Sequence, residues 1–263
     1  MVVRYLVTFT TSIAVSALVA VAGHGQSPAS STPAEQIARG DSLYREIKVQ
    51  ESLDAYAAVL AADSSNVDAL WRASRNIADL AEYEPNGSAR KERYVLAEQL
   101  ARRAIALRPT EAEAHFDLAR ALGRVALSVG KKDRVKYAKE IRNHALEALR
   151  IAPEHPGALH VMGVWNAEVM RLSGITRWMA KNFLGGRIFD EASWPRAIEY
   201  MEHAARVDPV RLVHKLDLAE IYLDVGEKAK AREQLEAVIN GKRTELNDER
   251  YQRKAEEMLR KLK

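Results

Sequence analysis

A spacing of ten residues between a proline and a small residue occurs three times in this chain, and it constrains the fold more than any other feature. The three pairs are Pro109 with Ala119, Pro153 with Gly163, and Pro209 with Ala219. An alanine also stands five residues before each of these prolines, at Ala104, Ala148 and Ala204. An internal repeat of this kind indicates stacked helical hairpins, because no single unit can bury its apolar face alone.

The spacing fits the tetratricopeptide repeat, a pair of antiparallel helices in about 34 residues. Small residues are expected at about position 8 and about position 20, where the two helices cross. A proline is expected where the second helix ends, because it lacks an N–H group and disfavours helix in the residue before it. The first small position recurs five times along the chain, at Gly40, Ser74, Ala119, Gly163 and Ala219.

The interval between the two small positions predicts how long each hairpin is. It is regular in the first and fifth units, from Gly40 to Ser52 and from Ala219 to Ala231. The three middle units are longer by 11, 10 and 22 residues. We therefore expect long second helices over residues 91–107 and 131–151, with a turn at Gly130, and an insertion at about 169–193 in the fourth unit.

These features predict an all-α fold, a tetratricopeptide-like α-solenoid. It would be a right-handed superhelix of about five helical hairpins over residues 34–263, closed by a polar capping helix over 247–263. The second unit would end at Pro109 and the fifth at Asn240-Gly241. Ser193 is expected to cap the helix whose first turn holds Pro195.

The N-terminal residues are typical of a secretory signal peptide over residues 1–25. Arg4 precedes an uncharged apolar stretch, and Ala20-Val21-Ala22 offers a cleavage site near residues 22–26. An uncleaved membrane anchor is the alternative reading. Residues 26–33 are rich in Ser, Pro and Ala and indicate a flexible linker. The expected location is therefore outside the cytoplasm, periplasmic or secreted.

Composition and motifs argue against several classes of function. The chain has no cysteine, and its net charge of +4 is small for a nucleic-acid-binding protein. Its histidines show no ligand spacing, and no metalloprotease, nucleophile-elbow or phosphate-loop motif occurs. We therefore expect no catalytic residues, no metal and no cofactor, and we do not expect an enzyme.

Fixed positions of the first helix in each repeat line the concave groove of such a solenoid. Seven of them are candidate binding residues: Trp71, Arg72, Arg75, Phe116, Arg120, Arg124 and His160. They suggest a basic wall with aromatics, opposite an acidic wall at Asp217, Glu220 and Asp224. The arginines could bind carboxylates or phosphates. Alternatively, Arg120 and Arg124 pair with acids on neighbouring helices.

The insertion at about residues 169–189 is basic and apolar. Its candidate ligand-facing or membrane-facing residues are Arg171, Ile175, Trp178, Met179, Lys181 and Phe183. An amphipathic helix of this composition suits a membrane surface, a lipid or a partner groove. The alternative is that it packs against the inner face of the solenoid.

Four stretches of the chain resemble the regulator of microtubule dynamics family. They are Leu70-Trp71-Arg72-Ala73-Ser74-Arg75, His160-Val161-Met162-Gly163-Val164-Trp165, Phe183-Leu184-Gly185-Gly186 and Ala197-Ile198-Glu199-Tyr200. The resemblance covers roughly residues 34–240. It implies the solenoid fold and a hydrophobic ligand cavity. It does not carry over a cytoskeletal role, because an exported bacterial member would meet no microtubules.

The sequence thus predicts a non-catalytic interaction scaffold that binds a protein or peptide in its concave groove. The alternative is a carrier or sensor of an anionic, lipid-like ligand held between the concave arginines and the insertion. A lipid or membrane surface is a further possible partner, and no nucleic acid is expected. The sequence does not predict the oligomeric state.

Overall fold

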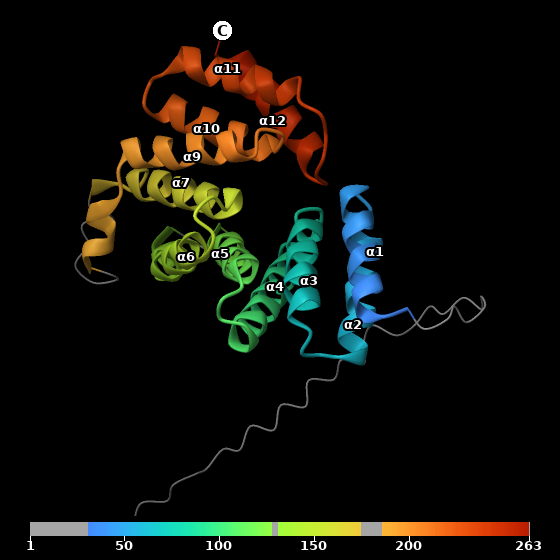
Figure 1. The fold of residues 1–263 in the computed structure, drawn as a ribbon. Coiled ribbons are helices and arrows are strands. Elements are labelled where there is room, and N and C mark those ends of the chain that lie inside the picture. The colour runs from blue at the N-terminus through green and yellow to red at the C-terminus, as the bar shows by residue number, and fades with distance from the viewer. Residues whose placement is uncertain (1–30, 128–130, 175–185, 263) are drawn as a thin grey trace, which may run out of the picture. The chain divides into compact units, whose positions relative to one another are not determined.

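The computed structural model describes residues 31–127, 131–174 and 186–262, and within these ranges the chain forms eleven α-helices, one 3₁₀ helix and no strand. Ten of the α-helices form five hairpins in chain order (Figure 1). The hairpins are α1 (Pro33–Arg45) with α2 (Val49–Ala62), α3 (Val67–Ala81) with α4 (Gly87–Leu107), α5 (Ala112–Leu127) with α6 (Lys131–Ile151), α7 (Pro156–Met170) with α9 (Trp194–Val207), and α10 (Leu212–Asp224) with α11 (Lys228–Ile239). Helix α12 (Asp248–Lys261) follows them. The predicted tetratricopeptide-like solenoid is confirmed.

The three repeated prolines end the second helices of their hairpins. Helices α4, α6 and α9 each end two residues before a proline. In each case the residue before the proline still donates its N–H to a carbonyl oxygen, at 2.8–3.0 Å. That carbonyl belongs to the repeated alanine five residues before the proline. These alanines are fully buried. The proline then stops the helix, and the alanine allows close packing at its last turn.

The small residues of the repeat lie where the two helices of a hairpin cross. A Cβ atom added to Gly40 would lie 2.4 Å from the Tyr56 ring, so only glycine fits there. The Ser52 hydroxyl donates to the Gly40 carbonyl over 2.8 Å, and the Ser74 hydroxyl donates to the Ala97 carbonyl over 2.8 Å. Both serines are buried, so these bonds satisfy polar groups at the closest point of contact.

The predicted long second helices differ slightly in their limits. Helix α6 spans the expected residues 131–151, whereas α4 begins four residues earlier than expected, at Gly87. The Asn86 side chain accepts hydrogen bonds from the N–H groups of Ser88 and Ala89, which starts the helix there. In the fourth unit α7 ends at Met170, and α9 begins after the predicted cap Ser193. The 3₁₀ helix η2 (Gly186–Glu191) precedes it.

Helix α12 caps the last hairpin. Ala255, Met258 and Leu259 pack against the apolar side chains of α10 and α11. The Gln252 side-chain amide donates to three carbonyls at the end of α11, at Val238, Ile239 and Gly241. The end of α11 is therefore satisfied by a side chain of the capping helix.

Several predictions lie outside the described residues. They include the signal peptide over residues 1–25, most of the linker over 26–33 and the turn at Gly130. Among the helices that the structure describes, none combines the length and apolar character that crossing a membrane requires.

Candidate functional site

The first helices of successive hairpins pack side by side, α3 beside α5, α5 beside α7 and α7 beside α10. Their polar side chains form a network that links one hairpin to the next. We call this network the inner face. It contains the predicted groove residues together with the acids that surround them.

Asp79 on α3 joins three helices of the inner face. Its carboxylate accepts a hydrogen bond from the Tyr44 hydroxyl of α1 over 3.0 Å and one from Arg120 of α5 over 2.9 Å. The Asp79 and Arg120 side chains are only 13% and 15% exposed, so the ion pair is partly shielded from water. Burial, followed by the charge of Asp79, raises the pKa of Tyr44 well above its usual value.

Asp117 is the most buried acid of the network. It is 1% exposed, and an Arg120 guanidinium nitrogen lies 3.1 Å from it. Burial raises the pKa of Asp117 to about 7, although the charge of Arg120 opposes that rise. This carboxyl group therefore changes charge near neutral pH, in contrast to an ordinary aspartate.

Glu82, directly after α3, connects the second hairpin to α5 and to the capping helix. It pairs with Arg124 of α5 over 3.0 Å and with Arg250 of α12 over 3.1 Å. Beside it, the Tyr83 hydroxyl donates to the Leu246 carbonyl over 2.6 Å. Residues of the second hairpin thus contact the capping helix and the segment that leads into it.

Arg75 differs from the other predicted groove arginines. Its guanidinium lies 3.5 Å from the centre of the Tyr44 ring and 5.5 Å from the centre of the Trp71 ring. Its hydrogen bonds go to neutral groups, the Asn76 carbonyl oxygen and the Tyr56 hydroxyl. No ion pair between described residues includes Arg75, and the buried Trp71 indole N–H beside it has no acceptor there either. This part of the inner face thus holds an arginine without a direct ion pair, whose charge still acts on Asp41 and Asp117, and an unused donor.

The remaining arginines are compensated, in line with the internal alternative. Arg72 pairs with Asp41 over 2.8 Å, and Arg120 and Arg124 pair with the acids described above. The expected division into a basic and an acidic wall is therefore wrong, because Asp79 and Glu82 stand among the arginines. The division fails because carboxylates of α1 and α3 reach the neighbouring first helices.

The two predicted groove aromatics are packed between helices. Trp71 is 9% exposed and Phe116 is 6% exposed. The Phe116 ring fills the space that a side chain at Gly157 would need, since a Cβ atom there would lie 2.5 Å from it. Whether either ring contacts a partner stays a prediction.

The last predicted groove residue, His160, lies on the opposite part of the inner face. Its Nδ1 atom is 2.9 Å from Nδ1 of His214, and its Nε2 atom is 3.2 Å from Asp217. Burial raises the pKa of Asp217, but the hydrogen bond and the charge of His160 outweigh it, so the pKa lies below the usual value.

Only one predicted residue of the insertion, Arg171, falls within the described residues. Its guanidinium pairs with Glu168 and Asp224, each over 2.8 Å. The other candidates lie outside them: Ile175, Trp178, Met179, Lys181 and Phe183. The roles of the insertion in ligand carriage and membrane contact stay predictions. In the three described ranges no cluster of three or more metal-ligating side chains occurs.

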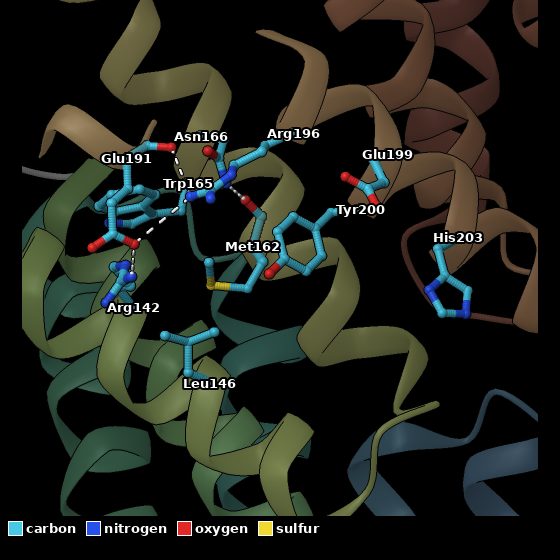
Figure 2. A pocket seen from close by; sticks show the side chains of 10 residues that line it. All are labelled: Arg142, Leu146, Met162, Trp165, Asn166, Glu191, Arg196, Glu199, Tyr200 and His203. Carbon is cyan, nitrogen blue, oxygen red and sulfur yellow. Dashed lines mark hydrogen bonds and ion pairs between the residues drawn. The ribbon is translucent and has the colours of Figure 1, made fainter. Parts of the chain in front are cut away.

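A cavity of about 400 Å³ lies away from the inner face, between α6, α7, η2 and α9. Figure 2 shows the Tyr200 ring beside Met162 at its centre, with Arg142 and Arg196 held by Glu191 at one side. No pattern in the sequence pointed to this cavity, because its lining comes from four elements of two different repeats.

Several members of the network were not predicted from the sequence. Asp41 stands at a groove position of the first repeat, so the same rule applied to that repeat would have found it. Glu82 and Arg250 follow no repeat position, because they lie at a helix end and in the capping helix.

Comparisons with known proteins agree with the fold. The family model described as Regulator of microtubule dynamics protein 1-3 matches residues 36–263. Regulator of microtubule dynamics protein 1 of Bos taurus is 28% identical over 153 residues, which cover 56% of this chain and 46% of that protein. Protein 3 of Bos taurus is 23% identical over 199 residues, covering 74% and 41%. The chain thus spans somewhat less than half the length of these relatives.

A solved structure has the same fold at low sequence identity. A thermophilic tetratricopeptide-repeat protein of Thermus thermophilus superposes with a TM-score of 0.62 and 14% identity, over 85% of this chain and 98% of that one. This similarity supports the fold and carries no information about a ligand.

Proposed function

Because this chain belongs to the regulator of microtubule dynamics protein 1-3 family, whose model matches residues 36–263, we propose that it is a non-catalytic scaffold that binds a protein or peptide on its inner face. The fold and the family are typical of interaction scaffolds. The relatives' printed name concerns microtubules, and that role is not part of the proposal.

The observation that carries the proposal is the state of Arg75. The Arg75 guanidinium lies 3.5 Å from the centre of the Tyr44 ring, and this contact limits its conformational freedom, so binding an acceptor costs less entropy. Its neighbours Arg72 and Arg120 make direct ion pairs with carboxylates, whereas Arg75 makes none with the described residues. An acceptor group of a partner, a carboxylate or a backbone carbonyl, would complete this position.

The test is a capture experiment with a matched control. The wild-type protein would be used as bait in an extract of its own source, and each captured protein would be purified and its Kd measured by calorimetry. Arg75→Glu should weaken binding at least about tenfold, because it removes the donor and adds repulsion. The control is Arg150→Glu, whose arginine lies exposed on α6 and pairs only with Glu147 among the described residues.

Equal binding by the two variants would refute an inner-face site at Arg75. Unfolding curves of both variants would accompany the measurement. Arg75→Glu should lose about 1–3 kcal/mol of stability, because it removes the contact with the Tyr44 ring and two hydrogen bonds. A larger loss in the free energy of unfolding would mean that weaker binding by Arg75→Glu reflects a folding defect.

Export is a separate proposal that rests on the N-terminal sequence alone. If residues 1–25 are a signal peptide, intact-mass measurement of the protein from its natural source should show a chain that begins near residues 22–26. A chain that retains Arg4 would refute cleavage. Fractionation of the same cells would locate the protein independently of the mass.

A further inference from the structure

Histidine side chains form two ring-to-ring pairs in the described part of the chain. Nδ1 of His115 lies 2.8 Å from Nδ1 of His144, and Nδ1 of His160 lies 2.9 Å from Nδ1 of His214. The other two described histidines each face a carboxylate instead, His155 with Glu113 and His203 with Glu154. Four of the six described histidines therefore use another histidine as a hydrogen-bond partner.

Both pairs join helices. His115 on α5 meets His144 on α6 within the third hairpin, and His160 on α7 meets His214 on α10 between the fourth and fifth hairpins. His214 is fully buried and His115 is 6% exposed, so water cannot readily replace either contact. The pair of His160 and His214 connects α7 directly to the C-terminal hairpin.

The Nδ1 to Nδ1 contact limits how many protons each pair can hold. One of the two nitrogens must donate and the other must accept, so the hydrogen bond needs a single proton between them. Together the two rings can carry at most three protons on their four nitrogens. A fourth proton would place two N–H groups against each other and make both rings cationic.

We propose that these two histidine pairs form an acid-sensitive joint, at which double protonation separates α10 from α7 and loosens the third hairpin. The device does not depend on the binding proposed above. It would change the geometry of the inner face, because α10 carries Asp217 and the following segments supply Arg250, the partner of Glu82.

Charged groups surround the pair of His160 and His214. Asp217 faces Nε2 of His160 over 3.2 Å. Arg211, at the start of α10, opposes a proton on His214, and Arg124 of α5 and Lys254 of α12 act on Asp217. A proton on the buried ring of His214 is therefore disfavoured in the closed joint, and its arrival is the step that opens the joint in this proposal.

The pair of His115 and His144 has an analogous environment. Glu140 and Glu147 of α6 favour a proton on His144, whereas Arg102 of α4 opposes it. Burial lowers the pKa of His144, and the charge of His115 lowers it further. In the other pair, burial, followed by the charges of His160 and Arg211, lowers the pKa of His214 strongly.

The sign of the pH effect follows from these directions. A histidine whose pKa is lower in the folded state than the ordinary value of about 6.5 binds fewer protons when folded. Its contribution to stability is present above about pH 6.5 and is lost as the pH falls below it. Each such histidine should reduce the folding equilibrium constant about tenfold per pH unit below that value, until its folded pKa is reached.

The experiment compares urea unfolding between about pH 8 and about pH 5.5 for the wild type, His214→Asn and His144→Asn. An asparagine amide can replace the Nδ1 hydrogen bond but cannot be protonated in this range. Between about pH 8 and about pH 5.5, the folding equilibrium constant of each variant should fall about tenfold less than that of the wild type. The control His203→Asn removes a histidine that lies outside both pairs and contacts Glu154, and it should leave the change that depends on the pairs intact.

A second measurement keeps the inference testable if a variant fails to fold. In ¹⁵N-histidine NMR spectra of the wild type, each pair should hold no more than three protons until the protein opens, and hydrogen exchange at about pH 5.5 should rise first in α10 and α11. Full protonation of both rings of a pair in the folded protein would overturn the proposal. An unchanged pH dependence in both asparagine variants would do the same.

Discussion

The inner face is held together by different chemistry in its two halves. Between α3 and α5 the contacts are arginine–carboxylate pairs, such as Arg120 with Asp79. Between α7 and α10 the rings of His160 and His214 contact each other through their Nδ1 atoms. Arginine stays charged at every physiological pH, whereas histidine is the side chain whose ordinary pKa lies closest to that range. The same repeat geometry is therefore compatible with one permanent joint and one that titrates.

The comparison also concerns how deeply each ion pair is shielded. Asp79 satisfies two donors from two different helices and is 13% exposed. In the second half, Asp224 pairs with Arg171, and their side chains are 31% and 30% exposed. A shielded acid that serves several donors should matter more than an acid that water can replace.

The largest effect is expected for Asp79→Ala. This change leaves Arg120 without its acid on α3 and the Tyr44 hydroxyl without an acceptor, so it should reduce the free energy of unfolding by about 3 kcal/mol. The matched variant Asp224→Ala in the second half should cost less than about 1 kcal/mol. Urea unfolding at about pH 7.5 measures both, and equal losses would show that shielding does not distinguish the two halves.

A smaller difference is expected at the helix crossings of the first and fourth hairpins. Gly40→Ala places a methyl group against the Tyr56 ring, which is fully buried and whose hydroxyl donates to Asp41 over 2.6 Å. It should cost about 2 kcal/mol. Gly163→Ala meets the movable Met201 methyl group at 2.9 Å, and also the Met201 Cβ at 3.2 Å and the Ala197 carbonyl at 3.3 Å, so the cost should be about 1 kcal/mol.

Thermal unfolding of the two glycine variants would rank them. Gly123→Ala is the control, because a Cβ atom at Gly123 meets nothing within 4 Å and alanine favours the helix. It should be neutral or slightly stabilising. A variant at Gly163 that is the less stable of the two would mean that the methionine is more tightly packed than its chemistry suggests.

The solenoid could be predicted from the sequence because every repeat needs the same residue types at its helix crossing and at the end of its second helix. A small residue at the crossing and a proline after the second helix are local requirements, and Gly40 and Pro109 can be read without knowing any distant neighbour. The length of α6 followed from the interval between the small positions for the same reason. The start of α4 did not, because it depends on the cap Asn86 and not on the repeat.

The inner face was harder to predict because its contacts join residues far apart in the chain. Repeat positions identified Arg75, Arg120 and Arg124, but the charge state of a groove depends on which acids reach it. Glu82 meets Arg250 across 168 positions, and no spacing encodes that contact. The sequence alone therefore could not distinguish Arg75 from the arginines that form ion pairs.

A further pH effect concerns Asp117 and has the opposite sign to that of the histidine pairs. Its pKa of about 7 lies above the unfolded value of about 3.9, so the folded state holds the proton that the unfolded state releases. Stability from this group is present at low pH and is lost as the pH rises toward about 7. Asp117→Asn cannot ionise, so from about pH 5 to about pH 8 its stability should rise relative to the wild type by about 2–3 kcal/mol.

The same measurement separates the two halves of the inner face. In wild-type protein Asp117 weakens the α3–α5 half as the pH rises, and His214 weakens the α7–α10 half as the pH falls. Between about pH 4 and about pH 6.5 the two effects therefore oppose each other. Asp117→Asn should make the loss of stability on acidification steeper, and His214→Asn should make it shallower. If the double variant departed from the sum of the two changes, the two groups would titrate as one coupled unit, which their separate contacts do not predict.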